Sequence, residues 1–213
     1  MNWSDIPYVW QECFNEAWMS FQEGSRPVGA IVIDEDENII ARGKSATFND
    51  VSDSVIKYNE LAHAEVNALL KLDNRVHKQV NNYALYSTLE PCPLCFGAFY
   101  MSGIRHLHFA AKDKYGGSTN LLGTTPYMQR KPITIQRSIL ELEHLSIVLN
   151  VYFDLLINHD KSLPVHEQLS LDYPNAVQVA KKWYDEKKLH DSSKLTMEQI
   201  FLMLHEELSF VYS

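Results

Sequence analysis

Two short motifs in this sequence contain side chains that can bind a metal ion. The first is His63-Ala64-Glu65, and the second is Pro91-Cys92-Pro93-Leu94-Cys95. Together they supply one imidazole and two thiolates, and cysteines three apart on a helical turn point to the same side. Three protein ligands leave the fourth tetrahedral position of Zn²⁺ open, which is typical of a catalytic zinc site. The motifs therefore predict that His63, Cys92 and Cys95 bind Zn²⁺.

Glu65 follows the histidine by two residues and is the candidate for moving protons. Zinc lowers the pKa of a bound water to roughly 7, and a carboxylate beside that water can accept its proton. In a hydrolytic deamination, Glu65 would deliver the proton to a ring nitrogen and to the departing amine. Ala64 would lie in the first turn of a helix, so its unpaired backbone N–H is a candidate substrate contact.

Each motif alone is weak, because redox motifs, zinc ribbons and chance also produce C-x-x-C. Their order and separation, with Thr88-Leu89-Glu90 leading into the second, reproduce the signature of zinc deaminases. The alternative from another class is a non-catalytic protein that uses zinc only for stability and binding. The presence of Glu65 counts against that alternative, because a purely structural zinc site needs no proton carrier.

The composition favours one folded unit that acts on a small molecule. The 213 residues are 46% hydrophobic and 22% charged, which is enough to bury one substantial core. The formal charge of −8, from 27 acidic and 19 basic residues, argues against a nucleic-acid partner, whose phosphates require many Lys and Arg contacts. Residues 105–131 depart from this balance, with five basic residues against one acidic residue. They offer contacts for a single phosphate, although a solvated loop is the commoner explanation.

We expect no targeting or membrane segment in this sequence. The first ten residues lack a basic cluster followed by an apolar run, so we expect no secretory signal. The most apolar stretch, residues 145–157, is much shorter than the roughly 20 residues that cross a bilayer. We therefore expect a cytoplasmic protein without a membrane partner. The odd number of cysteines favours a metal site over disulfides, and we expect Cys13 to be a core residue.

Hydrophobic periodicity predicts a layered α/β domain around the two motifs. Residues 9–21 have helical spacing, with Gly24 as a stop, and residues 28–33 and 39–41 read as a strand hairpin. The pattern then continues as helix, strand, helix, strand, and short β-like piece, over residues 62–72, 83–87, 95–101, 107–111 and 132–135. In this order, later strands can be joined by helical crossovers.

The character of the chain changes after residue 133. We place a zinc deaminase catalytic domain at residues 1–133 and a helical extension packed on it at residues 134–213. Helical patterns in the extension cover residues 139–157, 177–184 and 200–211. The extension holds twelve acidic and seven basic residues. We expect its apolar face to cover either the pocket mouth or a dimer face, because a surface of this size does not stay exposed.

The motifs and the strand at residues 27–32 resemble the cytidine deaminase superfamily, specifically the branch of guanine deaminases and bacterial tRNA adenosine deaminases. The similarity covers residues 5–123, and residues 88–104 are its most specific part. This resemblance implies a cytidine deaminase-like three-layer α/β/α fold with a five-stranded mixed sheet. It also implies Zn²⁺ as cofactor, hydrolytic release of ammonia, and frequently a homodimer.

The candidate substrate contacts come from the strand hairpin, the loop after it and the two motifs. That branch usually has a substrate-binding asparagine soon after the second strand, where this chain has residues 43–49. Either Ser45 occupies that place, or Asn49 reaches it from a shifted loop. Val28 and Pro91 complete the candidate substrate contacts.

Other residues draw attention without fitting a motif. Loop aromatics could line a base pocket, although each is individually explained by packing; they are Phe48, Tyr58, Tyr115 and Tyr127. His106 and His108 would share one side of a strand, which indicates a polar sheet face rather than a second metal site. Residues 116–118, Gly-Gly-Ser, read as a turn or an active-site loop.

The function that the sequence predicts is zinc-dependent hydrolytic deamination of a nucleobase or nucleoside. A purine base such as guanine, or a purine nucleoside, is the favoured substrate. A tRNA-specific adenosine deaminase is the main alternative, and a cytosine-type base ranks third. The alternative from another class is the non-catalytic zinc-stabilised binding protein.

Overall fold

A five-stranded mixed sheet forms the centre of this computed structural model, which describes residues 1–50, 52–158 and 163–211. The order across the sheet is β2-β1-β3-β4-β5. β1 is antiparallel to β2 and β3, whereas β3, β4 and β5 run parallel. The strands are β1 (Gly29–Ile33), β2 (Ile39–Lys44), β3 (Ala84–Leu89), β4 (His106–Ala111) and β5 (Thr134–Arg137). The predicted five-stranded mixed sheet is confirmed.

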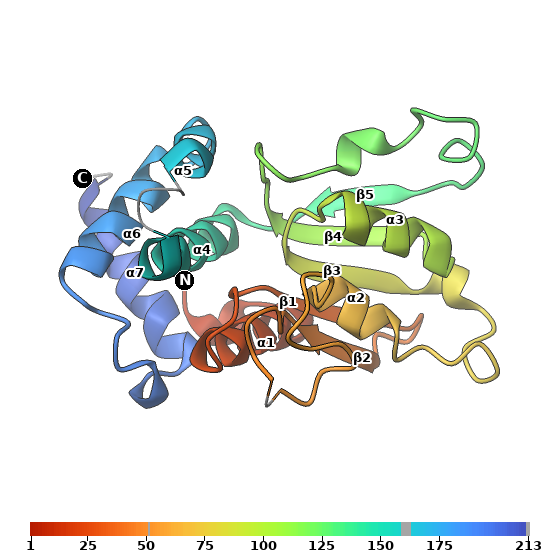
Figure 1. Cartoon of the computed structure of the whole chain (residues 1–213), viewed down its shortest axis with the longest axis horizontal. Coiled ribbons are helices and arrows are strands. Elements are labelled where there is room, and N and C mark those ends of the chain that lie inside the picture. Colours follow the sequence, from red (N-terminus) through yellow and green to blue (C-terminus); the bar gives the residue numbers. More distant parts are fainter. Residues whose placement is uncertain (51, 159–162, 212–213) are drawn as a thin grey trace.

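Helices cover both faces of the sheet, which gives three layers (Figure 1). α1 (Tyr8–Gln22) and α4 (Leu140–Asn158) pack on one face and share the larger apolar core. α2 (Ala64–Leu69) and α3 (Pro93–Ser102) enclose a second apolar core on the other face. The three-layer arrangement is therefore also confirmed. None of the described helices has the length and apolar character needed to cross a membrane.

The C-terminal segment adds further helices beside α4. These are α5 (Leu163–Ser170), α6 (Pro174–Asp185) and α7 (Met197–Val211), and α6 contacts α4, α5 and α7. α7 also contacts α1, and close to this contact the indole Nε1 of Trp18 donates a hydrogen bond to the carbonyl of Leu195 (2.8 Å). Although β5 and α4 follow residue 133, both belong to the three layers around the sheet.

Several element ends differ from the predicted ones for local reasons. Gly24 has a positive φ of 82° and follows α1 as the predicted stop. α2 ends at Leu69 rather than at residue 72, because the amides of Lys71 and Leu72 bond to carbonyls three residues back, tightening the last turn. α5 was not predicted: it buries only His166 and Leu169, too few apolar positions to show a helical period.

Two glycines allow helices to lie directly on the sheet. A Cβ at Gly43 of β2 would lie 2.2 Å from the carbonyl oxygen of Ala64 and 2.5 Å from the amide nitrogen of Ala68. At Gly29 of β1, the nearest backbone atom of α1 would be 2.1 Å away. No side chain fits at these separations, so both helices can approach the strands only because these positions are glycine.

Replacing Gly43 with alanine tests this close approach. We expect Gly43→Ala to destabilise the protein by about 1–3 kcal/mol, the usual cost of overpacking, because α2 must move away from β2. Urea denaturation measures the free energy of unfolding. Gly97→Ala is the matched control, since a Cβ there meets nothing within 4 Å and alanine favours a helix. Unchanged stability of Gly43→Ala would show that this contact does not position α2.

Candidate active site

Three metal-ligating side chains meet where the N-termini of α2 and α3 come together. His63 is the N-cap residue of α2, and Cys92 is the N-cap residue of α3. His63 Nδ1 lies 3.5 Å from Cys92 Sγ and 3.3 Å from Cys95 Sγ. The three ligand atoms lie within 4.8 Å of one another, and the described residues contain no other such group of His, Cys, Asp or Glu. One imidazole and two sulfurs at this spacing fit Zn²⁺.

The start of α3 favours negative charge on its sulfurs. Pro93 is the first residue of the helix, where its fixed φ fits and its missing N–H costs no hydrogen bond. A hydrogen bond from Cys95, with a further one from His63, lowers the pKa of Cys92 to about 4. The same bond to Cys92, together with burial, raises the pKa of Cys95. The N-terminal end of α3 therefore favours the thiolate form of Cys92, which is the form that binds a metal ion.

Glu65 lies beside the three ligands, on the first turn of α2. It is 3% exposed and lines the same cavity as His63 and Cys92. Ser87 of β3 donates a hydrogen bond from its Oγ to Glu65 Oε1 (3.2 Å). Burial raises the pKa of the Glu65 carboxyl. Its carboxylate is thus oriented by the sheet and lies in the cavity wall beside the metal site.

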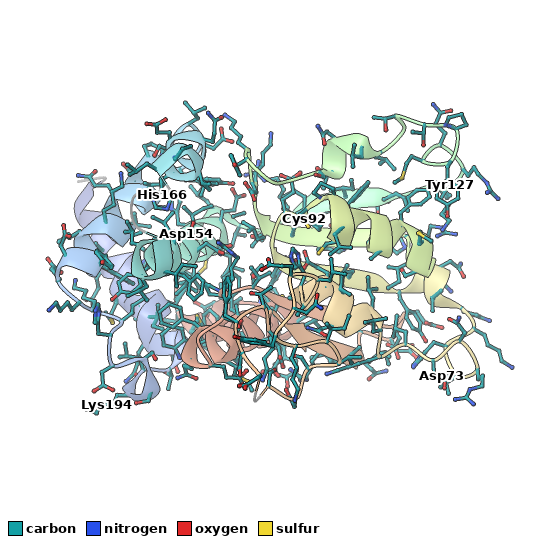
Figure 2. All side chains as sticks on the ribbon, in the orientation of Figure 1. Asp73, Cys92, Tyr127, Asp154, His166 and Lys194 are labelled. Atoms are coloured by element: carbon teal, nitrogen blue, oxygen red, sulfur yellow. The ribbon has the colours of Figure 1, made fainter. Side chains whose placement is uncertain are left out.

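A cavity of about 390 Å³ opens beside these residues. Helices from both halves of the chain form its wall, because Asp154 of α4 and Val165 of α5 line it together with His63, Cys92 and the first residues of α2. Figure 2 shows Cys92 near the middle of the molecule and Asp154 with His166 on the side of the C-terminal helices. The C-terminal segment therefore contributes to the pocket, as expected for one of its two proposed roles.

The structure separates the five candidate substrate contacts. Three of them line the cavity: Val28, Ser45 and Ala64. The other two do not. Asn49 donates a hydrogen bond from Nδ2 to Glu23 Oε2 (2.9 Å), and the carbonyl of Pro91 accepts one from the amide of Ser118 (2.9 Å). This arrangement favours Ser45 over Asn49 as the residue after β2 that faces the pocket.

The loop aromatics divide in the same way. Phe48 and Tyr115 line the cavity, and both are largely exposed. Tyr58 is 71% exposed and is not part of the wall. Tyr127 packs against Tyr100, with ring centroids 5.3 Å apart. Two of the four aromatics are thus available to a flat ligand.

Glu90 was not singled out from the sequence, yet it holds a loop against the site. Its Oε2 accepts a hydrogen bond from the amide of Asp113 (3.1 Å), and its Oε1 accepts one from the amide of Thr119 (3.2 Å). A Cβ at Gly117 would lie 2.4 Å from Glu90 Oε2, so only glycine permits this contact. Because Asp113 and Tyr115 line the cavity, the Gly-Gly-Ser segment lies in a loop that borders the pocket.

The remaining candidates lie away from the cavity. His108 stacks on Tyr86 with ring centroids 4.4 Å apart, and His106 Nδ1 contacts Thr134 Oγ1 at 2.8 Å. Among the described residues, neither histidine belongs to a group of side chains that could hold a metal ion. The five basic residues of 105–131 are absent from the cavity wall, and one of them, Lys114, pairs with Asp172 (2.6 Å).

Comparison with known proteins gives one matching family model and several similar proteins. A model of the "Cytidine and deoxycytidylate deaminase zinc-binding region" matches residues 4–111. A tRNA-specific adenosine deaminase of Haemophilus influenzae is 38% identical over 45% of this chain and 51% of its own length. A tRNA-specific adenosine deaminase of Aquifex aeolicus is 31% identical over 71% of this chain and 96% of its own length.

Solved structures give the same fold. The guanine deaminase from Nitrosomonas europaea superposes with a TM-score of 0.52 at 23% identity, covering 68% of this chain and 82% of that one. A likeness at this identity concerns the arrangement of strands and helices. The substrate depends on the side chains that line the cavity, which the shared fold does not define.

The zinc ligands are tested by removing each sulfur. We expect Cys92→Ala and Cys95→Ala to lose bound zinc and stability, because two ligands hold the ion poorly and metal binding is coupled to folding. Atomic absorption of the purified proteins measures zinc per chain. Cys13→Ala is the matched control, since Cys13 is buried in the other apolar core. Full zinc content in both site variants would show that other residues bind the metal.

Proposed function

We propose a function for this chain from the premise that it belongs to the cytidine and deoxycytidylate deaminase zinc-binding family. The protein is a zinc-dependent hydrolase that releases ammonia from an amino-substituted nucleobase or nucleoside. The observation that carries this proposal is the placement of a buried carboxylate, Glu65, in the same cavity wall as His63 and Cys92. A structural zinc site has four protein ligands and no cavity. The described residues supply three ligands and a pocket large enough for a base.

The chemistry divides between the metal and the chain's own residues. His63, Cys92 and Cys95 would hold Zn²⁺, which when bound would supply Lewis-acid activation of the attacking water. Glu65 would take one proton from this water and give it to the ring nitrogen beside the reacting carbon. It would then take the second proton from the hydroxyl group added to the base and give it to the amine, which leaves as ammonia while the carbonyl forms. Ser87 keeps the Glu65 carboxylate in place through its hydrogen bond. The Ala64 amide is the first of α2 and is available to the substrate.

The cavity favours a small neutral substrate. Its wall contains five carboxylates, from Glu60, Glu65, Glu90, Asp113 and Asp154, against a single arginine. A strand of nucleic acid would bring several phosphates toward these carboxylates, and its binding would need many basic contacts. A free purine base such as guanine, or a purine nucleoside, avoids this repulsion. Phe48 and Tyr115 offer apolar ring surface for such a base.

A tRNA adenosine is the second candidate substrate, favoured by the names of the Haemophilus and Aquifex relatives. A flipped adenosine places only one base in the pocket, and the rest of the tRNA would lie outside it. Ammonia release from guanine, adenine, cytosine, their nucleosides and a tRNA anticodon hairpin, at physiological salt, separates the two candidates. We expect a small compound to be turned over fastest. Faster turnover of the hairpin would make the tRNA assignment the correct one.

Replacing Glu65 tests the proton-transfer step. We expect Glu65→Gln to retain zinc and fold while losing on the order of 10²–10⁴ in kcat, the typical contribution of a general acid–base. Steady-state ammonia release and metal analysis measure the two properties. Glu35→Gln, in the exposed hairpin between β1 and β2, is the control. Wild-type turnover by Glu65→Gln would remove Glu65 from the mechanism.

Two further expectations, a homodimer and a cytoplasmic location, stay predictions. Light scattering of the zinc-loaded protein checks the first.

A further inference from the structure

Arg26 is the arginine of the cavity wall, and the C-terminal helices hold it there. The residue lies just before β1, and one guanidinium nitrogen, Nη2, donates a hydrogen bond to Asp154 Oδ1 of α4 (2.6 Å). The guanidinium also lies over the ring of Phe153, 5.7 Å from its centroid. Two adjacent residues of α4 thus fix one arginine at the pocket.

Asp154 in turn contacts a residue of α5, His166. Its side chain is 5% exposed, and His166 Nε2, from a side chain that is 1% exposed, lies 3.5 Å from Asp154 Oδ2. Although burial opposes it, the nearby imidazole of His166 and the charge of Arg26 lower the pKa of Asp154. A carboxylate fixed in this way keeps the guanidinium in one orientation. Figure 2 shows Asp154 and His166 close together among the C-terminal helices.

The guanidinium still has donors for a ligand. It carries five N–H groups in a planar fork, and Asp154 is its side-chain acceptor within the described parts of the chain. Arg26 lines the same cavity as His63 and Glu65, so its unused donors lie at the wall of the pocket where the reaction is proposed to occur.

The charges around Arg26 decide which acceptor it can take. With Asp154 the pair is neutral, and the four other carboxylates of the wall repel a phosphate or carboxylate ligand. A neutral ring carbonyl meets no such repulsion. The planar fork of arginine can bind O6 and N7 of guanine through two N–H groups, and it can bind the carbonyl oxygen of cytosine through one. Adenine lacks a carbonyl group.

We propose that Arg26 is a specificity-determining residue that hydrogen-bonds the ring carbonyl of an amino-oxo base, guanine or cytosine, and so selects against adenine. Asp154 is the positioning residue that orients it. This inference rests on the proposed function, because it names the substrate class of the same cavity.

The test compares Arg26 variants of the zinc-loaded full chain. We expect Arg26→Met, which keeps the apolar stem, to lose about 10- to 100-fold in kcat/KM for guanine, the cost of a lost bidentate contact. The loss for cytosine should be smaller, because only one hydrogen bond is removed. Adenine turnover should change far less. Arg26→Lys keeps the charge but not the planar fork, so it should restore little. Asp154→Asn should raise KM for the oxo-base more than it lowers kcat.

Binding without turnover gives a second measurement. Hypoxanthine and uracil carry the carbonyl but not the reacting amine, whereas unsubstituted purine lacks both groups. By calorimetry, we expect wild type to bind hypoxanthine or uracil more tightly than purine, and Arg26→Met to abolish this difference. Arg42→Met is the matched control, because Arg42 of β2 pairs with Glu12 and is not in the cavity wall.

The outcomes distinguish the inference from the proposed function. Failure of wild type to release ammonia from any compound would overturn the function, while selective loss of hypoxanthine or uracil binding in Arg26→Met would still support the contact. Turnover in which Arg26→Met affects oxo-bases and adenine alike, or in which adenine is the preferred base, would overturn the inference alone. Wild-type selectivity in Arg26→Lys, or no binding of either oxo-probe, would overturn it as well.

Discussion

The meeting of two helix N-termini on one face of the sheet is the constraint on which the site depends. His63 precedes α2 and Cys92 precedes α3, so the ligand atoms meet only if both helices start at the same place. Gly43 sets the distance of α2 from the sheet. α3 joins the parallel strands β3 and β4, and such a crossover has one strongly preferred hand. Backbone geometry therefore brings the three ligand residues to one place.

The C-terminal helices both cover the sheet and line the cavity of the candidate active site. α4 covers the sheet with its apolar residues and also presents Asp154 to the cavity. α5 contributes Val165 to the wall and buries His166 behind Asp154. Buried ionic groups are costly unless paired, so the alignment of Arg26, Asp154 and His166 ties the position of these helices to the pocket. A change of packing between α4 and α5 would thus alter the pocket wall.

The parts of the site that the sequence predicted are those fixed by local spacing. Residue type and separation were enough for the zinc ligands and for Glu65 beside them, and the resemblance to zinc deaminases that these motifs carry is confirmed. The Arg26–Asp154 pair joins residues 128 positions apart, and no local period connects them. Ser45 and Asn49 could not be separated in advance, because the path of the loop after β2 decides which one reaches the cavity. That path depends in part on Glu23, which holds both Lys44 and Asn49.

The contact between α1 and α7 has a consequence for how the chain is made. Trp18 bonds to the carbonyl of Leu195, 177 residues later, and the ring of Trp3 packs 5.3 Å from that of Phe201. α1 is synthesised before α7, yet part of its apolar face finds its partner only when residues near 200 leave the ribosome. At about 5–20 residues per second, translation leaves that face uncovered for roughly ten seconds or more. Protection of the nascent chain by chaperones during this interval would matter more for this protein than for one whose first helix packs on its immediate neighbours.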